Sequence, residues 1–353
     1  MAHPTTPPIF DGHNDALLKL YRNGGLANAA QFTNGYDAAL DLPKARAGGF
    51  GGGFFAVYVP SPIDLETKFH EMTKSAYDLP LPAPIPAPEA MPVVMHQVAI
   101  LLDLQAQGAL TICRSAAEIR TCLARGQMAA IFHIEGAEAI DGDLHTLDVL
   151  YAACLRSIGP VWSRTTLFGH GVPFRFPSTP DIGAGLSDAG KRLVKRCNEL
   201  RIMIDLSHLN EAGFWEVAAL SNAPLVATHS NAHAICPHAR NLTDRQLDAI
   251  RDSDGMVGLN FAVAFLRDDG RMLDDVPLGQ MLRHLDHLID RLGEDRVGLG
   301  SDYDGAVVPK GLDTVADLPN LRVAMAAHGY DGPLIAKLCH ENWLRVLELT
   351  WGE

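Results

Sequence analysis

Residues 9–15 read IFDGHND, and this stretch indicates both the fold and the chemistry of the chain. A short apolar run enters it, and a helix-like run, ALLKL, leaves it. In an extended segment, residues two apart point to the same side, so His13 and Asp15 can reach one metal ion. Neutral imidazole and carboxylate together suit zinc or another borderline divalent ion. The stretch therefore predicts a strand that delivers metal ligands at its end.

Seven further apolar runs follow this one and alternate with helical patterns along the chain. The eight expected strands lie at residues 8–11, 53–59, 129–134, 158–162, 202–206, 225–228, 256–260 and 296–300. Alternating β and α units indicate a parallel sheet, and eight of them favour closure into an α/β fold of the (β/α)8, or TIM, barrel type. A doubly wound open sheet is the alternative. Barrels of this length commonly form one domain, so we expect a single catalytic domain over residues 1–353.

Four segments carry clear helix signals. Residues 187–200 and 210–220 read as N-capped helices, and residues 277–292 place apolar side chains at helical spacing. Residues 243–250 open with Thr-x-x-Gln, which is a capping-box pattern.

Two loop insertions interrupt the alternation. Residues 78–93 are rich in proline and are expected to form a loop over one barrel face, before a helix near residues 95–107. Residues 168–181 form a second long connection with Gly, Pro and aromatic residues. Long loops in compact domains are often lids or binding loops, although surface decoration is the alternative.

Composition excludes several classes of partner. The chain has 353 residues, is 47% hydrophobic and carries a net charge of −13. Without a basic cluster, neither nucleic acid nor an anionic membrane is expected as partner. We see no signal-peptide pattern at the start and no apolar run near the roughly 18 residues that a membrane span needs. The cysteines are scattered, which predicts free thiols and a cytoplasmic protein; a homodimer is left open.

Five of the eight expected strands end in metal-ligand side chains. These ends are His13 and Asp15, then HIEG at 133–136, DLSH at 205–208, THSN at 228–231 and SDYDG at 301–305. Any one of them has a plain alternative, because His and Asp at strand ends often cap the next helix. Since a barrel gathers the carboxyl ends of its strands at one face, their coincidence predicts a metal centre there.

The number of candidate ligands exceeds what one tetrahedral ion takes, so two ions roughly 3.5–4 Å apart become plausible. Two dications at that distance repel each other and need a shared anionic ligand. In some metal-dependent hydrolase barrels this is a carbamylated lysine, but no lysine lies between Lys74 and Lys191. Glu135 is the bridge that remains available.

Several motifs together resemble the membrane (renal-type) dipeptidase family, as a soluble bacterial-type member. They are DGHND at 11–15, IEG at 134–136, DLSH at 205–208, THSN at 228–231, ARN at 239–241 and GSDYDG at 300–305. The resemblance continues to ENWLRV at 341–346 and so covers nearly the whole chain. It implies a zinc-dependent dipeptidase with two zinc ions per chain, a metal-bridging hydroxide and frequent acceptance of a D-residue at the C-terminal position.

The resemblance also implies the residue roles. The metal ligands would be His13 and Asp15 on one zinc, His208 and His229 on the other, and Glu135 on both. Asp302 would be the catalytic acid/base, and Arg240 would hold the carboxylate of a small dipeptide substrate.

One position departs from the family pattern. The family usually has a His at the end of strand four that helps to polarise the scissile carbonyl, and Trp162 stands there in this chain. His170, a few residues further on, is the candidate replacement in substrate binding. The departure leaves the pocket open to a rival function, that of a metal-dependent amidohydrolase or lactonase acting on another small amide or ester. A second alternative is a non-catalytic barrel that retains its metals, against which Asp302 speaks because a pure binding protein needs no base there.

Overall fold

Eight parallel strands form the centre of the structure, and all eight overlap the runs that the sequence predicts. The computed structural model describes residues 6–61 and 70–352. The strands are β1 (Ile9–Asn14), β2 (Phe50–Tyr58), β5 (Ala129–Glu135), β6 (Leu155–Gly159), β8 (Met203–Ile204), β9 (Val226–Ala227), β10 (Met256–Asn260) and β11 (Val297–Gly300). Their order is β8-β6-β5-β2-β1-β11-β10-β9. A parallel bridge from Asp205 to Val226 joins the two ends, so the sheet is a (β/α)8 barrel and not an open sheet.

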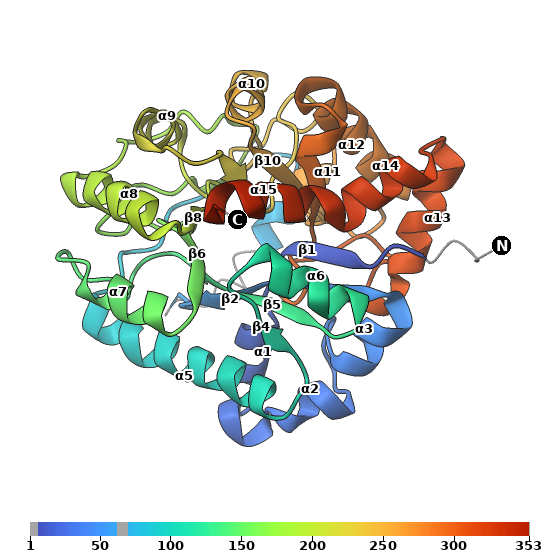
Figure 1. Ribbon diagram of the computed structural model, residues 1–353. Coiled ribbons are helices and arrows are strands. Elements are labelled where there is room, and N and C mark those ends of the chain that lie inside the picture. The colour runs from blue at the N-terminus through green and yellow to red at the C-terminus, as the bar shows by residue number, and fades with distance from the viewer. Residues whose placement is uncertain (1–5, 62–69, 353) are drawn as a thin grey trace.

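Helices surround the barrel on all sides (Figure 1). The longer helices are α1 (Ala16–Arg22), α3 (Leu42–Gly48), α5 (Ala87–Ala106), α6 (Ala116–Ala124), α7 (His145–Ala152), α8 (Asp188–Leu200), α9 (Glu211–Leu220), α10 (Asp244–Asp252), α12 (Leu278–Leu292), α13 (Leu318–His328) and α15 (Asn342–Trp351). Short helices α2 (Ala30–Asn34), α11 (Val263–Leu266) and α14 (Gly332–Ala336) lie between them, and β4 (Thr111–Ile112) pairs with β5 at the edge of the barrel.

The predicted helix starts are confirmed at the level of individual hydrogen bonds. Ser187 accepts from the backbone N–H of Gly190 at the start of α8, and Asn210 accepts from that of Gly213 at the start of α9. Thr243 and Gln246 form both hydrogen bonds of a capping box at α10. Such caps satisfy backbone donors that a helix leaves free in its first turn, which is why local sequence suffices to place them.

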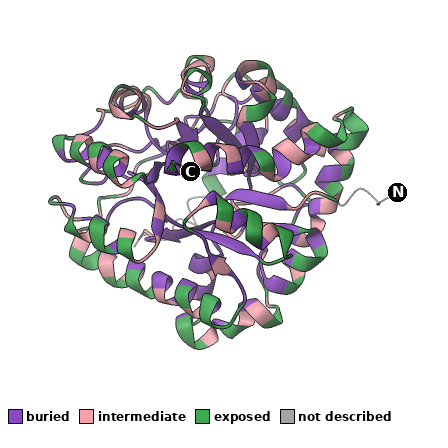
Figure 2. Ribbon diagram, viewed as in Figure 1, coloured by how far each residue is buried: buried purple, intermediate pink, exposed green. Residues whose placement is uncertain are grey.

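The barrel is closed at one end by the C-terminal helix. In Figure 1, α15 lies across the end of the barrel that faces the viewer. Its Trp343 is fully buried, donates from Nε1 to the Leu299 carbonyl at 3.0 Å and packs against Phe54, with ring centroids 5.1 Å apart. The eight barrel strands are buried except at Gly51 and Arg156, whereas the longer outer helices each expose one face (Figure 2). The chemistry therefore has to lie at the opposite end.

The structure corrects the prediction for the proline-rich insertion. The helix predicted near 95–107 begins eight residues earlier, at Ala87, and includes Pro92. Pro88 lies in the first helical turn, where a proline costs little because the N–H groups lack helical partners. Pro92 lies inside the helix and removes one helical hydrogen bond, and the burial of Ala90, Val94 and Val98 offsets this cost. Only residues 80–86 of the insertion form an irregular loop.

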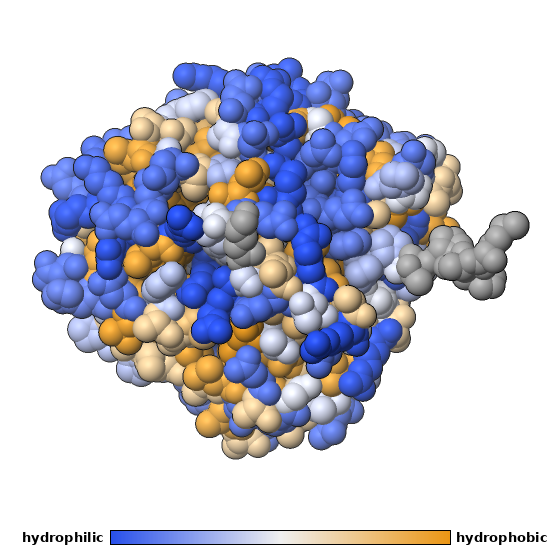
Figure 3. Space-filling view, viewed as in Figure 1, coloured by the Kyte–Doolittle hydropathy of each residue, from blue (hydrophilic) through white to orange (hydrophobic). Residues whose placement is uncertain are grey.

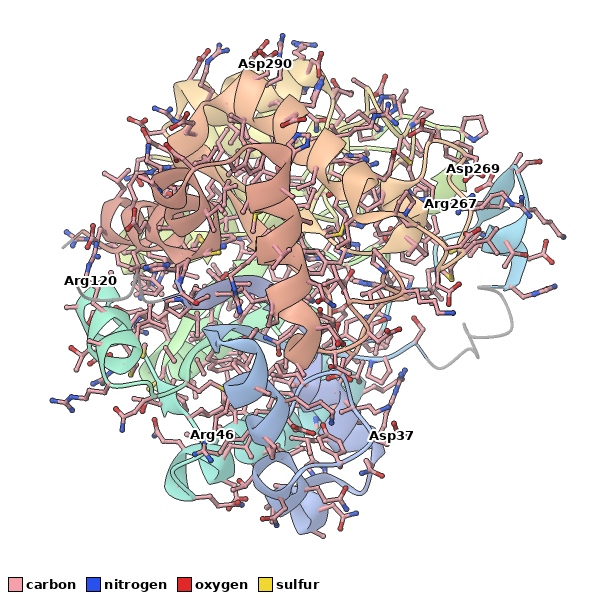
Figure 4. The ribbon with its side chains drawn as sticks, turned by 90° about the vertical axis from the view of Figure 1, so that its right-hand side faces the viewer. Asp37, Arg46, Arg120, Arg267, Asp269 and Asp290 are labelled. Atoms are coloured by element: carbon pink, nitrogen blue, oxygen red, sulfur yellow. The ribbon has the colours of Figure 1, made fainter. Side chains whose placement is uncertain are left out.

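The two insertions also pair with each other, which the sequence did not predict. Strand β3 (Tyr77–Leu79) comes from the first insertion and β7 (Phe174–Phe176) from the second, and they form an antiparallel ribbon. In the side view of Figure 4, the ribbon projects near the labelled Arg267 and Asp269, away from Arg120 at the other end of the barrel. The insertions therefore build a rim over the carboxyl ends of the strands.

The outer surface is largely polar over the helices α8 to α10, at the upper left of the view in Figure 3. Within residues 6–61 and 70–352, none of the helices combines the length and the apolar character that crossing a bilayer requires. The six cysteines are free thiols, and five of them are buried.

Candidate metal centre and active site

The predicted ligand residues meet at the carboxyl ends of the strands. His13 lies near the end of β1, and Asp15 follows that strand as the residue before α1. Glu135 ends β5, while His208 and His229 stand just beyond β8 and β9. All five side chains are buried. The parallel ladder brings residues more than 200 positions apart to one end of the barrel.

Glu135 lies between two groups of ligand atoms. Its Oε1 is 3.0 Å from His208 Nε2 and 3.4 Å from His229 Nε2. Its other oxygen, Oε2, is 3.6 Å from His13 Nε2, which is in turn 3.6 Å from Asp15 Oδ2. Each carboxylate oxygen therefore faces one pair of ligands, an arrangement that suits a bridging carboxylate between two ions.

Several imidazole nitrogens of this cluster are unpartnered or crowded against one another. The Nε2 atoms of His208 and His229 are only 3.2 Å apart, and both nitrogens of His13 are buried without a hydrogen-bond partner among the described residues. Buried polar atoms are almost always satisfied, so each exception needs an explanation. Two imidazole lone pairs converging with a carboxylate form a donor set typical of zinc, and the residues present therefore fit a metal centre.

Electrostatics of the cluster also favours a bound cation. Burial alone would lower the pKa of His13, but the neighbouring Glu135 and Asp15 outweigh it and raise that pKa to about 10. Burial raises the pKa of Glu135 well above its ordinary value. Burial lowers the pKa values of His208 and His229, which keeps them neutral. The crowded carboxylates attract positive charge, while the two neutral imidazoles can donate lone pairs.

A buried chain of hydrogen bonds from Asp205 through Thr228, which we call the relay, fixes the orientation of His229. The sequence motifs did not assign this role to Thr228 or Asp205. Asp205 Oδ2 accepts from the Thr228 hydroxyl at 2.6 Å, and the same hydroxyl oxygen lies 2.8 Å from His229 Nδ1. Because the Thr228 proton points to Asp205, the hydroxyl accepts from Nδ1 and leaves the Nε2 lone pair free. Ser163 Oγ lies 2.9 Å from His208 Nδ1 and occupies the equivalent place there. The sequence did offer one signal for this role, since Thr228 is a hydroxyl residue immediately before a candidate ligand His.

Asp302 lies beside the ligands on the side of His13 and Asp15. Suitable ligand atoms of these three residues fall within 4.8 Å of one another. Asp302 has a left-handed backbone, with φ of 62°, and its N–H donates to the His13 carbonyl at 3.0 Å. Asn260 Nδ2 donates to its Oδ2 at 3.0 Å, and burial raises its pKa. A buried carboxyl group held beside His13 and Asp15 has the chemistry of an acid/base or of a further metal ligand.

Of the two predicted substrate contacts, the structure brings only Arg240 to the cluster. Arg240 is buried and donates to the main-chain carbonyls of Ser207 and of His229, the latter at 3.3 Å. Burial lowers its pKa to about 10, so the guanidinium remains charged at neutral pH. Neither Arg240 nor His170 is among the described residues that line the cavity above the candidate ligands. Arg240 lies directly beside the cluster, whereas His170 Nδ1 lies 3.3 Å from Thr165 Oγ1. This placement gives no support to a substrate role for His170.

The ligands open into a cavity of about 700 Å³. Asp15, Glu135, His208 and Asp302 line its base. Trp162, at the position where the family usually has a His, lines the side next to His208, with ring centroids 5.8 Å apart. A parallel barrel with His and carboxylate ligands at its carboxyl ends and a cavity above them defines a metal-dependent hydrolase.

Comparison with known proteins identifies the family within this class. The profile of the membrane dipeptidase family, peptidase family M19, matches residues 4–350. The chain therefore belongs to the membrane dipeptidase family and is an enzyme of its metallo-dipeptidase class. The resemblance seen in the sequence motifs is confirmed.

Similar proteins include solved structures and uncharacterised relatives. A metallopeptidase from Rhodobacter sphaeroides, solved with a phosphinate mimic of the dipeptide L-Ala-D-Ala, is 57% identical with a TM-score of 0.96, over 98% of this chain and 100% of that one. A probable dipeptidase from Pseudomonas aeruginosa shares the fold at 23% identity, with a TM-score of 0.81 over 98% of this chain and 96% of that one. An uncharacterised Klebsiella pneumoniae protein from the pqqA 5′ region is 51% identical over 263 residues, 74% of this chain and 97% of its own length.

Removing the relay to His229 is expected to weaken metal binding without unfolding the barrel. Thr228→Val keeps the side-chain shape but loses the hydroxyl that holds His229 Nδ1, and loss of such a contact typically lowers metal affinity about 10–100-fold. Competition with a chromophoric chelator measures the affinity. Thr350→Val is the matched control, because Thr350 is also buried but donates to Val346 within α15. Equal zinc affinity of the two variants would contradict the relay.

Proposed function

We propose that this enzyme is a zinc-dependent dipeptidase that binds two zinc ions per chain and hydrolyses the peptide bond of dipeptides, including those with a D-residue at the C-terminal position. The proposal rests on the orientation of the Glu135 carboxylate. One of its oxygens faces His208 and His229, and the other faces His13. The five ligand residues would be His13, Asp15, Glu135, His208 and His229. When bound, the ions would polarise the scissile carbonyl and lower the pKa of a bridging water so that hydroxide forms near neutral pH.

The protein groups around the ligands supply proton transfer and orientation. Asp302 would accept the proton released by the attacking water and return it to the leaving amine, the usual work of a positioned carboxyl group. Its hydrogen bond from Asn260 fixes the carboxylate toward the cluster. The relative from Rhodobacter sphaeroides was solved with a phosphinate mimic of the dipeptide L-Ala-D-Ala, and this supports the choice of a small dipeptide substrate.

A buried cation beside the candidate ligands suits a substrate with a free carboxylate. Arg240 is a buried cation beside the ligands, and its Nε has no hydrogen-bond partner among the described residues. The planar fork of arginine matches a carboxylate, so Arg240 would hold the C-terminal carboxylate of a dipeptide. The β3–β7 ribbon stands at the rim and places Phe174 in the cavity lining, and we expect this to disfavour longer peptides.

A turnover screen of dipeptides with L- and D-residues at each position, in the presence of zinc, tests the function directly. Hydrolysis of free dipeptides, and poor hydrolysis of longer peptides, is the expected result. Folded, zinc-loaded protein that turns over none of them would contradict the proposal.

Loss of Arg240 is expected to remove selectivity for the free carboxylate. Arg240→Ala forfeits a charge-assisted contact worth about 1.5–3 kcal/mol, which corresponds to a roughly 10–150-fold lower kcat/KM for dipeptides. The matched substrate is the dipeptide amide, which should be poor in the parent enzyme and little changed in the variant. Equal turnover of acid and amide by the parent would favour a general amidohydrolase instead.

A further inference from the structure

The cavity above the ligands has one strongly aromatic side, which we call the aromatic wall. It consists of Tyr58, Trp162, Phe174 and Phe265, and all four line the cavity. Neighbouring rings are in contact: the centroids are 5.0 Å apart for Tyr58 and Trp162, 5.5 Å for Trp162 and Phe174, and 6.1 Å for Phe174 and Phe265. The wall is thus a continuous apolar surface.

The four residues come from separate parts of the chain. Tyr58 ends β2, Trp162 follows β6, Phe174 begins β7 of the ribbon and Phe265 lies in α11. The ribbon that carries Phe174 stands at the rim of the barrel, close to Arg267 and Asp269 in Figure 4. The wall exists because the insertion at 168–181 folds back over the strand ends.

Buried polar contacts hold the wall from behind. Arg164 has no exposed surface, and its guanidinium carbon lies 5.6 Å from the Trp162 ring centre and 5.7 Å from that of Tyr58. The guanidinium donates to Glu138 Oε1 at 2.7 and 2.9 Å and to the Val59 carbonyl at 2.8 Å. A cation that is fully paired in this way fixes the two rings, so the wall is preorganised for a ligand.

The wall extends from the proposed metal centre to Arg240, the residue proposed to hold the substrate carboxylate. At one end, the Trp162 ring lies 5.8 Å from the ring of the ligand His208. At the other end, the Arg240 guanidinium lies 5.4 Å from the centre of the Phe265 ring. In a dipeptide, the segment between the scissile carbonyl and the carboxylate is the C-terminal residue. The side chain that faces the wall is therefore that of the C-terminal residue.

The size of the cavity indicates a large side chain. The cavity of about 700 Å³ lies in the size range of sites that hold drug-sized ligands, so a dipeptide with two small side chains would leave part of it empty. The space left beside the wall has to be filled by a side chain or by water. Water against four aromatic faces is unfavourable, whereas an apolar side chain removes these faces from water, and an aromatic one adds ring contacts.

We propose that the aromatic wall makes the enzyme selective for dipeptides with a bulky apolar, preferably aromatic, residue at the C-terminal position. The proposal rests on the proposed function, because Arg240 and the metal centre set the direction of the substrate. It names the side-chain class that the site prefers and the residues that select it.

Selectivity is measured with kcat/KM for Ala-Ala, Ala-Phe and Phe-Ala, with the C-terminal residue in both L and D configuration. A C-terminal Phe should raise kcat/KM over Ala by roughly 10-fold or more, the effect of burying an aromatic side chain. Phe174→Ala should lower this Phe-to-Ala ratio about 10-fold, and Phe174→Leu should restore part of it. Phe174 packs on Trp162 and Phe265 within the wall, so the ratio reports on the wall.

The control is Trp215→Ala, which removes a large aromatic side chain from the outer helix α9, where Trp215 packs on Phe214 and Arg245. It should leave the ratio unchanged. Hydrolysis of Ala-Ala with no gain from a C-terminal Phe, or a gain only from an N-terminal Phe, would overturn the inference while leaving the dipeptidase function standing. A ratio that Phe174→Ala does not change would also overturn it. Failure of zinc-loaded enzyme to hydrolyse any dipeptide would overturn both.

Discussion

Replacing Glu135 by glutamine is expected to remove most bound metal and nearly all activity. The carboxylate faces ligand atoms on both sides, at 3.0 Å from His208 and 3.6 Å from His13, so one substitution disturbs both metal positions. A neutral amide also cannot offset the repulsion between two dications. Elemental analysis should find about two equivalents of zinc in the parent enzyme and well under one in the variant. Loss of several kcal/mol of metal-derived stabilisation corresponds to a roughly 10³-fold or larger fall in kcat/KM.

Glu138→Gln provides the matched control for this substitution. Glu138 is buried three residues further along the chain, but it accepts from Arg164 and takes no part in the ligand cluster. Measured below its unfolding temperature, the control should keep its zinc. If Glu135→Gln retained two equivalents of zinc, Glu135 would not be the bridge and the ligand assignment would have to change.

Replacing Asp302 by asparagine is expected to separate catalysis from metal binding. The amide keeps the shape of the side chain and can still accept the hydrogen bond from Asn260, but it cannot take up a proton. We expect most of the zinc to remain, while kcat falls by about 10²–10⁴-fold, the usual effect of losing a positioned acid/base. Parallel zinc analysis and steady-state kinetics on one dipeptide measure both quantities.

Asp304→Asn is the control at the same strand end. Asp304 also has a left-handed backbone, but its carboxylate accepts from the backbone N–H groups of Ala39 and Leu40, at 2.7 and 3.1 Å. Its replacement should change kcat far less than that of Asp302. Loss of zinc from Asp302→Asn would reassign Asp302 from proton transfer to metal ligation.

Glu135→Gln and Asp302→Asn together test whether metal binding and proton transfer are carried by different residues. Glu135 is expected to act through the metal ions and Asp302 through the proton. A variant that loses metal and one that keeps metal but loses turnover would therefore identify different steps of the same reaction. If both variants lost metal equally, the cluster would behave as one ligand set with no separate acid/base.

The sequence alone determined the features that depend on local order along the chain. The alternation of apolar runs and helical patterns predicted the eight strands, because each strand and each helix carries its own periodicity. Caps such as Ser187 and Thr243 were predicted because a cap involves only residues within one helical turn. The convergence of His13, Glu135, His208 and His229 was predicted because parallel strands bring their carboxyl ends together whatever the details of packing.

Only the tertiary structure decided the features that join distant segments. The pairing of β3 with β7 depends on two insertions about 100 residues apart, and no local pattern specifies that contact. The same holds for the relay from Asp205 through Thr228 to His229, and for the place of His170 outside the cavity. The start of α5 at Ala87 was missed because burial in the fold outweighed the local cost of Pro92. Periodicity and capping are short-range, whereas hydrogen-bond partners, burial and cavity walls are set by the closed barrel.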